Sequence, residues 1–550
     1  MIDRWDEAEA ARCDSDLTAC VYVSRLLGAE PALVLFGGGN TSVKSGADAG
    51  VLYVKGSGAD LAQVEQHDFT ALRLTQVQQL IDAGHLTNAQ LAQAASACVI
   101  GNGPRPSIET LLHAVLPHRF VLHSHADSIL AITNTDHGDR TAAEIFGALA
   151  PRVPFRESGF ELAKAAHEAY RAHATSSTIG LILLHHGVFS FGDSARSAYG
   201  NMLTLVNLAE AFLSSRNAWK LPASSTPRIW TTEQVIELRC AISRAAGVPL
   251  VLQLQDTPEF RAFAENPSAA NWWEEGPATP QHAVFVKRKP LFGRDVEGYA
   301  REYRSEVGRH RPGSLLKALG LDPAPRVVVD AQLGVWTAGI NAHYAAMTAE
   351  ILRHDIEIIS RASGHDRYAG LPGSAVLDAE INYGGFEAKA RARYSERDCL
   401  LGEVALLAGD ADASSAGIAH VLTERGAEVA APAAERISGA TLQISPTDHS
   451  PESYIRELVR QVGGLDILIL RPGWEAWLPA CRRLLQQAPR GGRIVLVGPA
   501  DWSARALREV VSIPGLRVST VDCDVGVVPP HLEQDLAQAC AANPDVLQRV

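Results

Sequence analysis

The last third of the chain alternates short apolar runs with helical segments, and this pattern constrains the fold more than any other feature of the sequence. From about residue 400 the apolar runs are "EVALLAG", "AEVAA", "LDILIL", "GRIVLVG" and "LRVSTVD". Runs of five or six residues without polar alternation suit strands that are buried on both faces, as in a parallel sheet covered by helices. The pattern predicts a doubly wound parallel sheet of the Rossmann type.

The first 220 residues show a second pattern, in which short apolar strands alternate with longer helical segments. The expected strands are "ALVLF" (32–36), "VLYV" (51–54), "RFVLHSH" (119–125) and "IGLILLHHG" (179–187). Such alternation indicates a domain that combines a sheet with helices, of the α/β or α+β type. The stretch "LPASSTPRIW" that follows has the Pro and Ser content of a linker.

The chain of 550 residues is too long for a single hydrophobic core, so we expect several domains in an α/β protein. We predict an α/β/α domain over residues 1–222, a mixed α/β middle region over residues 223–395 and a Rossmann-like domain over residues 396–550. Within the middle region, residues 326–336 are expected to form one strand and residues 342–362 a long helix. The basic run at residues 287–289 is expected on a solvated face.

Composition excludes some classes of partner. The net charge of −12 at pH 7 disfavours wide contact with nucleic acid or an anionic membrane, because both attract a positive surface. The charged N-terminus lacks the apolar core of a signal peptide, and no run of 18 apolar residues occurs, so we expect a cytoplasmic protein. Eight cysteines without a CxxC pair suit reduced thiols, so any metal must be held by histidines and carboxylates.

Two histidines stand two positions apart in "FVLHSHAD", at the end of an apolar run that predicts a buried strand. Side chains at positions i and i+2 of a strand leave the same face, so His123 and His125 point side by side. His185 and His186 follow another buried run, and only one of them can join the first two, because adjacent residues face opposite sides. Three histidines and an open fourth position are how catalytic zinc is held. Histidines that merely end strands at the surface would show the same spacing, and the pattern alone leaves both interpretations open.

A carboxylate precedes the first histidine strand in "GPRPSIETLLHAVL" (103–116). The Pro-Ser pair predicts a helix start and places Glu109 in the first turn, where the helix dipole favours a negative charge. Glu109 reaches the end of the His123 strand only if the chain folds back toward it, so it is either a catalytic carboxylate or a helix-terminal residue without chemistry. His113, four residues further on, is expected to be packed.

Two segments rich in glycine lie near the N-terminus. "LFGGGNTSVKSG" (35–46) places three glycines before Asn40, and consecutive glycines let backbone N–H groups form an anion-binding nest. It is not a P-loop, because no GK[ST] follows at the required spacing. A second segment, "YVKGSGADL" (53–61), is a similar candidate for an anion-binding turn, with Ser57 and Gly58. Each segment taken alone is also explained as a hairpin turn.

The ordered set GGGNTSVK, KGSG, PSIE, HSH and HHG closely resembles the class II aldolase/adducin family, whose members include zinc-dependent fuculose and rhamnulose phosphate aldolases. Five motifs occur in the family's order over about residues 15–220. The resemblance implies that Glu109 acts as the acid/base. It implies a zinc ion, or another divalent metal, bound by His123, His125 and His186. It implies a substrate phosphate held by Asn40, Ser57, Gly58 and Ser107. Ile108 departs from the second serine of some relatives, which puts the substrate or its phosphate affinity in doubt.

The C-terminal region, from about residue 400, extends the resemblance. Together with "GPATPQHAVFVKRKPL" (276–291), it is similar to long bifunctional proteins that join a rhamnulose-phosphate aldolase to a short-chain dehydrogenase. The cofactor loop "LAGDADASSAGIA" departs from the dehydrogenase glycine pattern and carries Asp410 and Asp412 where a pyrophosphate needs N–H donors. The catalytic Tyr-x3-Lys pair is also absent, because no lysine follows Tyr454 at the fourth position. We therefore expect a degenerate, structural or oligomerising domain that does not bind NAD(P).

The resemblance implies a zinc-dependent aldolase that cleaves a ketose 1-phosphate, such as rhamnulose 1-phosphate, into dihydroxyacetone phosphate and an aldehyde. An epimerase, a dehydratase or a decarboxylase could use the same metal site, and a non-catalytic adducin-like interaction protein is a further alternative. The retained histidines and Glu109 argue against the interaction protein. We expect a small sugar-phosphate substrate, no nucleic-acid or membrane partner, and a homo-oligomer.

Overall fold

The computed structural model describes residues 1–45, 50–394, 399–432, 436–445, 448, 450–511, 513–523 and 531–540. The chain forms two compact units. The first contains Met1–Leu221, Trp272–Ala283 and Arg353–Ala375, and the second contains Pro222–Asn271, Val284–Leu352 and Val376–Val550. Two short pieces of the predicted middle region thus belong to the same unit as the N-terminal residues. The division into three domains stays a prediction.

A seven-stranded sheet forms the centre of the first unit, in the order β3-β2-β1-β4-β7-β6-β5. Its strands are β1 (Asn40–Ser45), β2 (Val51–Lys55), β3 (Phe69–Arg73), β4 (Phe120–Ser124), β5 (Arg152–Val153), β6 (Gly180–Leu183) and β7 (Gly187–Gly192). All neighbours are antiparallel except β5 and β6. Asn40 pairs with His123 in the register of β1 and β4, so the end of the first glycine segment meets the histidine strand.

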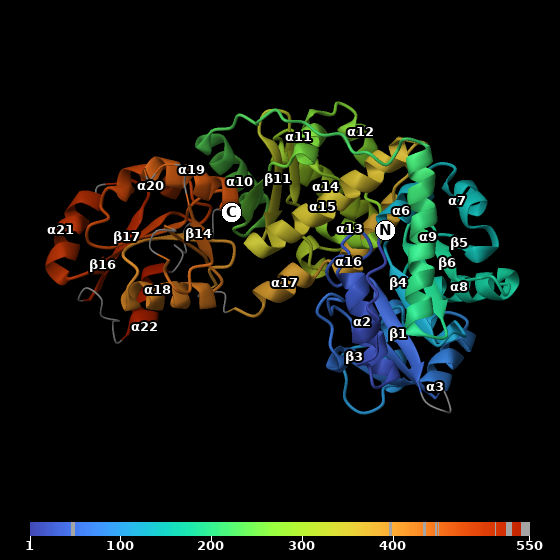
Figure 1. The fold of residues 1–550 in the computed structure, drawn as a ribbon. Coiled ribbons are helices and arrows are strands. Elements are labelled where there is room, and N and C mark those ends of the chain that lie inside the picture. Colours follow the sequence, from blue (N-terminus) through green and yellow to red (C-terminus); the bar gives the residue numbers. More distant parts are fainter. Residues whose placement is uncertain are drawn as a thin grey trace. The chain divides into compact units, whose positions relative to one another are not determined.

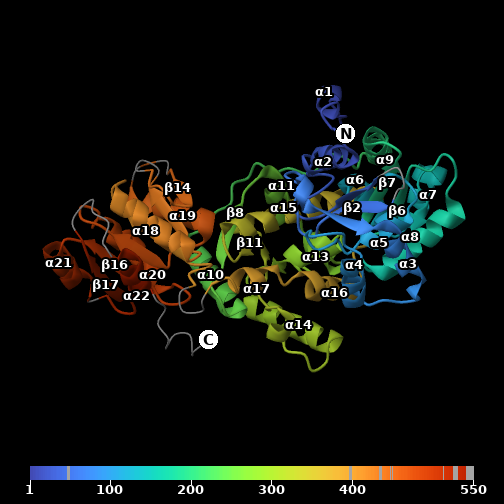
Figure 2. The same cartoon turned by 90° about the horizontal axis from the view of Figure 1, so that it is seen from below.

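Helices cover both faces of this sheet. In Figure 2, α2 (Asp16–Gly28) and α9 (Ala195–Ser215) lie on one side, and α5 (Thr110–Val115) and α8 (Phe160–His173) lie on the other. Along β4, Phe120 and Leu122 pack in the core with α2 and α9, whereas Val121 packs in the core with α5 and α8. The other helices before residue 221 are α1 (Glu7–Ala10), α3 (Leu74–Gln79), α4 (Asn88–Ala97), α6 (Asp127–Thr133) and α7 (Gly138–Phe146). The predicted α/β/α architecture is confirmed.

The segment 32–36, expected as a strand, is a run of turns after α2. Its apolar side chains are buried nevertheless, and Leu33 is 1% exposed. The backbone pairs with the loop that follows β4: the His125 N–H donates to the Leu33 carbonyl, and the Asp127 N–H donates to the Ala32 carbonyl, both at 3.0 Å. A short apolar run satisfies its backbone here without a ladder, which periodicity cannot distinguish from a strand.

A four-stranded sheet belongs to the second unit and has the order β8-β11-β10-β9. Its strands are β8 (Val251–Gln255), β9 (Leu291–Phe292), β10 (Val327–Asp330) and β11 (Gly334–Gly339). Residues 326–336 therefore form a hairpin rather than one strand, and the Asp330 carboxylate closes the turn by accepting the N–H groups of Gln332 and Leu333. The helices within this part are α10 (Thr232–Ala246), α11 (Pro258–Glu265), α14 (Val296–His310) and α17 (Phe386–Arg391).

Four helices of the middle region contain residues of both units. They are α12 (Ala269–Glu274), α13 (Pro280–Val286), α15 (Ala342–Ser363) and α16 (Gly373–Tyr383). The helix expected over residues 342–362 corresponds to α15. In the described part of the chain, every helix is too short or too polar to span a bilayer.

The C-terminal sheet is parallel throughout and has the order β14-β13-β12-β15-β16-β17. Its strands are β12 (Val404–Ala408), β13 (Glu428–Pro432), β14 (Leu442–Ile444), β15 (Ile467–Leu470), β16 (Arg493–Gly498) and β17 (Arg517–Asp522). Counted along the chain, this is the strand order of the Rossmann fold. Figure 1 shows α18 (Ala413–Glu424) and α22 (Leu532–Cys540) on one side, and α19 (Pro451–Val462) and α20 (Trp477–Gln486) on the other. The remaining described helix of this part, α21 (Ala500–Val510), connects β16 to β17. The predicted doubly wound sheet is confirmed.

The basic run at residues 287–289 does not form a solvated face. Lys287 is only 6% exposed, and its Nζ donates to the Asp322 carbonyl. Arg288 pairs with Glu306. A buried ammonium needs partners close by. The loop before β10 and the helix α14, which are both distant in the sequence, supply them here, and the run itself does not reveal this.

A buried carboxylic acid also belongs to this cluster. Glu380 is 3% exposed, and its Oε2 accepts a 2.5 Å hydrogen bond from the Tyr303 hydroxyl. Burial raises the pKa of Glu380 to about 7, although the charges of Lys287 and Arg326 and the Tyr303 hydrogen bond lower it. The folded state therefore holds a proton on Glu380 at pH values where the unfolded chain, with an ordinary pKa of 4.5, has lost it.

Glu380→Gln is expected to flatten the pH dependence of stability. Because the pKa of Glu380 is higher in the folded state, its contribution to the free energy of unfolding falls as the pH rises from 4.5 to about 7. The shift corresponds to about 3 kcal/mol over this window. Glutamine can still accept from Tyr303 but has no proton to lose. Urea unfolding at pH 5 and pH 8 measures the difference, and an equal loss in both proteins would contradict the assignment.

Candidate functional site

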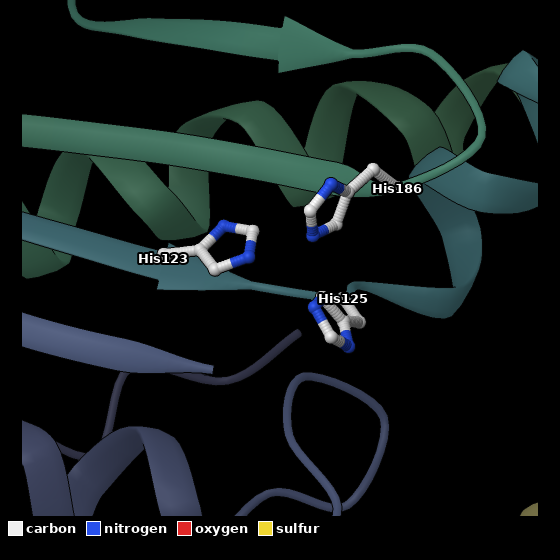
Figure 3. A group of neighbouring side chains, drawn as sticks. All are labelled: His123, His125 and His186. Atoms are coloured by element: carbon white, nitrogen blue, oxygen red, sulfur yellow. The ribbon is translucent and has the colours of Figure 1, made fainter. Parts of the chain in front are cut away.

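Three histidines face one another in the first unit. Figure 3 shows the rings of His123, His125 and His186 turned toward a common space. The ring centroids are 5.0, 5.1 and 5.2 Å apart. One nitrogen of each ring lies within 4.8 Å of the corresponding nitrogens of the other two. Three imidazoles at this spacing can share one metal ion.

Neighbouring strands bring these side chains together. His123 belongs to β4, His125 follows the end of that strand, and His186 lies in the turn between β6 and β7. Since β7 pairs with β4, the turn sits beside the end of the histidine strand. His185 takes a left-handed φ of 58°, and its ring lies 6.3 Å from that of Phe155 instead. The structure thus groups His186, rather than His185, with the other two histidines.

His123 presents a free nitrogen to the group. The side chain is fully buried, and this burial lowers the pKa of His123 to about 4, so the ring is neutral at pH 7. Its Nδ1–H donates to the Val188 carbonyl at 3.0 Å. Its Nε2 is buried and makes no hydrogen bond with any residue that the structure describes. A buried lone pair without a donor is costly, and a metal ion in the space between the histidines would satisfy it.

A carboxylate lies beside the histidines. Glu109 is the N-cap residue of α5, one position before the first turn in which it was expected. Its Oε1 lies 3.2 Å from His186 Nε2, and its Oε2 lies 3.5 Å from His123 Nε2. Burial alone would raise the pKa of Glu109, but the two histidines and a hydrogen bond from Asn40 hold it well below its usual value. An ionised carboxylate in this position can donate an oxygen to a metal or carry a proton.

Asn40 fixes the orientation of Glu109. Its Nδ2 donates to Glu109 Oε2 at 2.6 Å and lies 3.5 Å from Ser107 Oγ. Its Oδ1 accepts from His113 Nε2, and His113 Nδ1 accepts from the Ser42 hydroxyl at 2.7 Å. Burial lowers the pKa of His113 to about 3. His113 is packed, as expected, and its hydrogen bonds hold the amide of Asn40 in one orientation.

The two glycine segments lie side by side. A Cβ on Gly37 would come within 3.3 Å of the Gly58 carbonyl oxygen. Lys55 joins the segments, because its buried Nζ donates to the Gly37 carbonyl at 3.1 Å and to the Ala59 carbonyl at 2.6 Å. Gly58 has a left-handed φ of 86°, and the adjacent Ser57 is exposed. The turn therefore offers a hydroxyl and an open backbone position, while Asn40 and Ser107 lie at the carboxylate.

One residue of this group was not expected from the sequence. Gln281 Oε1 accepts a 2.8 Å hydrogen bond from His125 Nδ1, across 156 positions of the chain. Its Nε2 donates to the Leu35 carbonyl at 2.7 Å. Gln281 lies in the stretch "GPATPQHAVFVKRKPL" (276–291), whose local pattern assigns it no role. The signal that identifies Gln281 is the return of Trp272–Ala283 to the first unit, which motif spacing does not report.

The C-terminal sheet carries side chains where a dinucleotide fold binds phosphate. Asp412 caps α18 and accepts the Ser415 N–H at 2.8 Å. Arg471 Nη1 donates to Asp412 Oδ1 at 2.5 Å and to Ser415 Oγ at 2.7 Å. In Rossmann folds this helix N-terminus binds the pyrophosphate. Tyr454 is buried in the core, and its ring packs edge-on against that of Trp477.

Two family models match the chain. Residues 18–213 match the class II aldolase and adducin N-terminal domain. Residues 231–389 match the second domain of class II aldolases. The second matched segment includes Gln281, which is hydrogen-bonded to His125. Both matched segments therefore contribute side chains to the site.

The chain is similar to proteins from several organisms. The uncharacterised oxidoreductase YuxG of Bacillus subtilis (strain 168) is 28% identical over 403 residues, which cover 67% of this chain and 57% of that protein. The N-terminal class II aldolase domain of a conserved Thermoplasma acidophilum protein is 37% identical, with 39% of this chain and 99% of that chain covered and a TM-score of 0.35. L-fuculose-1-phosphate aldolase from Thermus thermophilus is 22% identical, with 36% and 95% covered and a TM-score of 0.26. The chain thus spans little more than half the length of its curated relative.

Proposed function

Because residues 18–213 belong to the class II aldolase and adducin family, we propose that this chain is a metal-dependent aldolase of ketose 1-phosphates. Rhamnulose 1-phosphate is the first candidate substrate, with dihydroxyacetone phosphate and an aldehyde as products. One observation carries the proposal. The rings of His125 and His186 and the carboxylate of Glu109 lie beside the buried Nε2 of His123, which has no hydrogen-bond partner among the described residues.

The metal would be held by His123, His125 and His186. Each offers one ring nitrogen, and no cysteine belongs to the group, so the donor set suits Zn²⁺ and also accepts other divalent ions. When bound, the ion supplies Lewis-acid stabilisation of the negative charge that develops on the substrate oxygens. Metal analysis of the purified protein identifies the ion.

Glu109 would carry the proton that the reaction requires. When the bond beside the carbonyl breaks, the carbon that keeps the electron pair must receive a proton, and in the reverse direction it must lose one. Asn40 holds Oε2 of Glu109, and Oε1, which lies 3.2 Å from His186 Nε2, is the oxygen proposed for this transfer. The pKa of Glu109 lies well below its usual value, so the carboxylate is ionised at neutral pH.

The substrate phosphate would bind at the two glycine turns. Asn40, Ser57, Gly58 and Ser107 are the proposed contacts. Asn40 already donates a hydrogen bond to Glu109, so a phosphate bound at Asn40 would have a fixed position relative to the acid/base residue. Binding energy gained at the phosphate would then serve to orient the carbon that reacts.

Ser57→Ala is expected to raise KM for the sugar phosphate about tenfold to a hundredfold, because a hydrogen bond to a charged group contributes roughly 1.5–3 kcal/mol. The side chain is exposed, so the fold and the metal content should not change. Initial-rate kinetics measure the effect. Ser96→Ala, which removes a hydroxyl bonded to the Ala92 carbonyl on α4, is the matched control. An unchanged KM for Ser57→Ala would remove this residue from the phosphate site.

A screen of ketose 1-phosphates tests the proposed function directly. Release of dihydroxyacetone phosphate is measured with a coupled assay, with Zn²⁺ added and with a chelator. Release that depends on the metal supports the aldolase. Epimerised, dehydrated or decarboxylated product would assign another reaction to the same site, and absence of bound metal would favour a non-catalytic interaction protein.

For the C-terminal sheet we infer a structural role without NAD(P). This is supported by Arg471, Asp412 and Ser415, which bond to one another where a dinucleotide would place its pyrophosphate. A Cβ on Gly409 would lie 2.6 Å from Arg471 Cδ, so the loop and the arginine are closely packed. A role in homo-oligomer assembly stays part of the proposal.

A further inference from the structure

Gln281 connects two parts of the proposed site through one side-chain amide. Its oxygen accepts from His125 Nδ1 and its nitrogen donates to the Leu35 carbonyl, at the start of the first glycine segment. The two bonds use opposite ends of the same rigid planar group. One side-chain amide thus links the glycine segment to the ring of His125.

The bond to His125 determines which ring nitrogen carries the hydrogen and which carries the lone pair. When Nδ1 carries the hydrogen that it donates to Gln281, the lone pair of a neutral ring is on Nε2. Partners of this kind orient metal-binding histidines and maintain the required tautomer, and their loss typically costs about tenfold to a hundredfold in metal affinity. His123 has a comparable partner in the Val188 carbonyl, so the two histidines of the β4 end are both held through Nδ1.

The glycine segment is shaped to receive the amide. A Cβ on Gly38 would lie 2.4 Å from Gln281 Oε1 and 2.6 Å from its Nε2. Any larger residue at position 38 would displace the side chain of Gln281. The absence of a side chain at position 38 therefore leaves the space that the amide of Gln281 occupies.

The segment that carries Gln281 is anchored by buried polar groups of the same unit. The neighbouring His282 bonds through Nδ1 to Asp355 Oδ1 at 2.7 Å, and the Ala278 N–H donates to the same oxygen at 3.0 Å. Asn134 Nδ2 donates to the Ala278 carbonyl at 2.7 Å. These bonds hold the backbone on both sides of Gln281, so its amide is positioned before any ligand binds.

We propose that Gln281 is a positioning residue that orients His125 for the metal and couples this ligand to the phosphate-binding glycine segment. The inference rests on the proposed metal site and adds a residue from the segment that matches the second-domain model. It assigns the second domain a part in metal binding. The acceptor half of the amide acts on metal affinity, and the donor half acts on substrate binding.

Two substitutions separate these halves. Gln281→Leu removes both hydrogen bonds at similar size and is expected to lower the affinity for Zn²⁺ about tenfold to a hundredfold. Gln281→Glu keeps an oxygen acceptor for His125 but places a carboxylate against the Leu35 carbonyl. It should restore the affinity for Zn²⁺ to within about threefold of the original protein, while KM for the sugar phosphate rises by at least about tenfold.

The affinity for Zn²⁺ is measured on the full-length protein by competition with a chromophoric chelator, and thermal unfolding checks the fold. Gln78→Leu is the matched control, because its amide donates to the Ala114 carbonyl instead, and it should leave the affinity unchanged. Equal affinities for the original protein and Gln281→Leu would overturn the inference while leaving the proposed function intact. A full-length protein that binds no metal would overturn both. Should Gln281→Leu fail to fold, a normal KM for Gln281→Glu would still contradict the coupling.

Discussion

Glu109→Gln is expected to keep its metal and to lose cleavage of the sugar phosphate by about a hundredfold to ten-thousandfold. The amide is nearly the same size as the carboxylate and can still accept a hydrogen bond from Asn40, so the three histidines should stay in place. It cannot take up or release the proton at the reacting carbon. Single-turnover rates and metal content, measured on the same preparation, separate the two effects.

A second buried glutamate gives the control. Glu380→Gln makes the same chemical change in the other compact unit, where Glu380 bonds to Tyr303. This variant should retain cleavage at neutral pH. Cleavage by Glu109→Gln within about tenfold of the original rate would remove Glu109 from the acid/base role. Loss of metal from the same variant would instead assign Glu109 as a metal ligand.

His186→Ala should abolish stoichiometric metal binding and, with it, cleavage. Loss of a residue that merely supports a metal ligand typically costs about tenfold to a hundredfold in affinity, and loss of a ligand should cost more. His123→Ala is expected to behave in the same way, because its Nε2 is a buried nitrogen of the histidine group without a hydrogen bond among the described residues. Metal content after dialysis, followed by activity with added Zn²⁺, measures both consequences.

The adjacent histidine provides a close control for this prediction. His185→Ala removes an imidazole from the same turn, but the ring of His185 packs near Phe155 rather than with the other histidines. The left-handed φ of 58° at this position makes the alanine variant slightly strained, so its stability should be checked. Full metal content in His186→Ala, or its loss only in His185→Ala, would contradict the proposed ligands.

Much of this arrangement could be predicted because it is local. The spacing of His123 and His125 follows from the alternation of side chains along a strand, and the C-terminal sheet follows from its uninterrupted apolar runs. The choice of His186 over His185 rests on the resemblance to the family, because local geometry left both residues open. Short-range rules are reliable for such features because the residues involved are neighbours in the chain.

The remaining features depend on contacts between distant segments. Residues 32–36 have the composition of a strand, but the loop after β4 pairs with their backbone and leaves them as turns. Lys287 belongs to a basic run, yet Asp322 and Tyr303 surround its ammonium. Gln281 has no distinguishing local pattern at all. In the first two cases tertiary packing overrides the preference of the local sequence, and in the third only the fold brings Gln281 to His125.

The first unit consists of three separate segments of the chain, so its parts are synthesised at different times. A ribosome that has produced residues 1–221 has already released the three histidines and Glu109, but Gln281 and its anchor Asp355 come later. At translation rates of about 5–20 residues per second, the wait is on the order of ten seconds. Under the proposed roles, the three metal ligands are therefore synthesised before the residue that orients one of them. His125 gains its hydrogen bond from Gln281 only after the later segment of the first unit has been made.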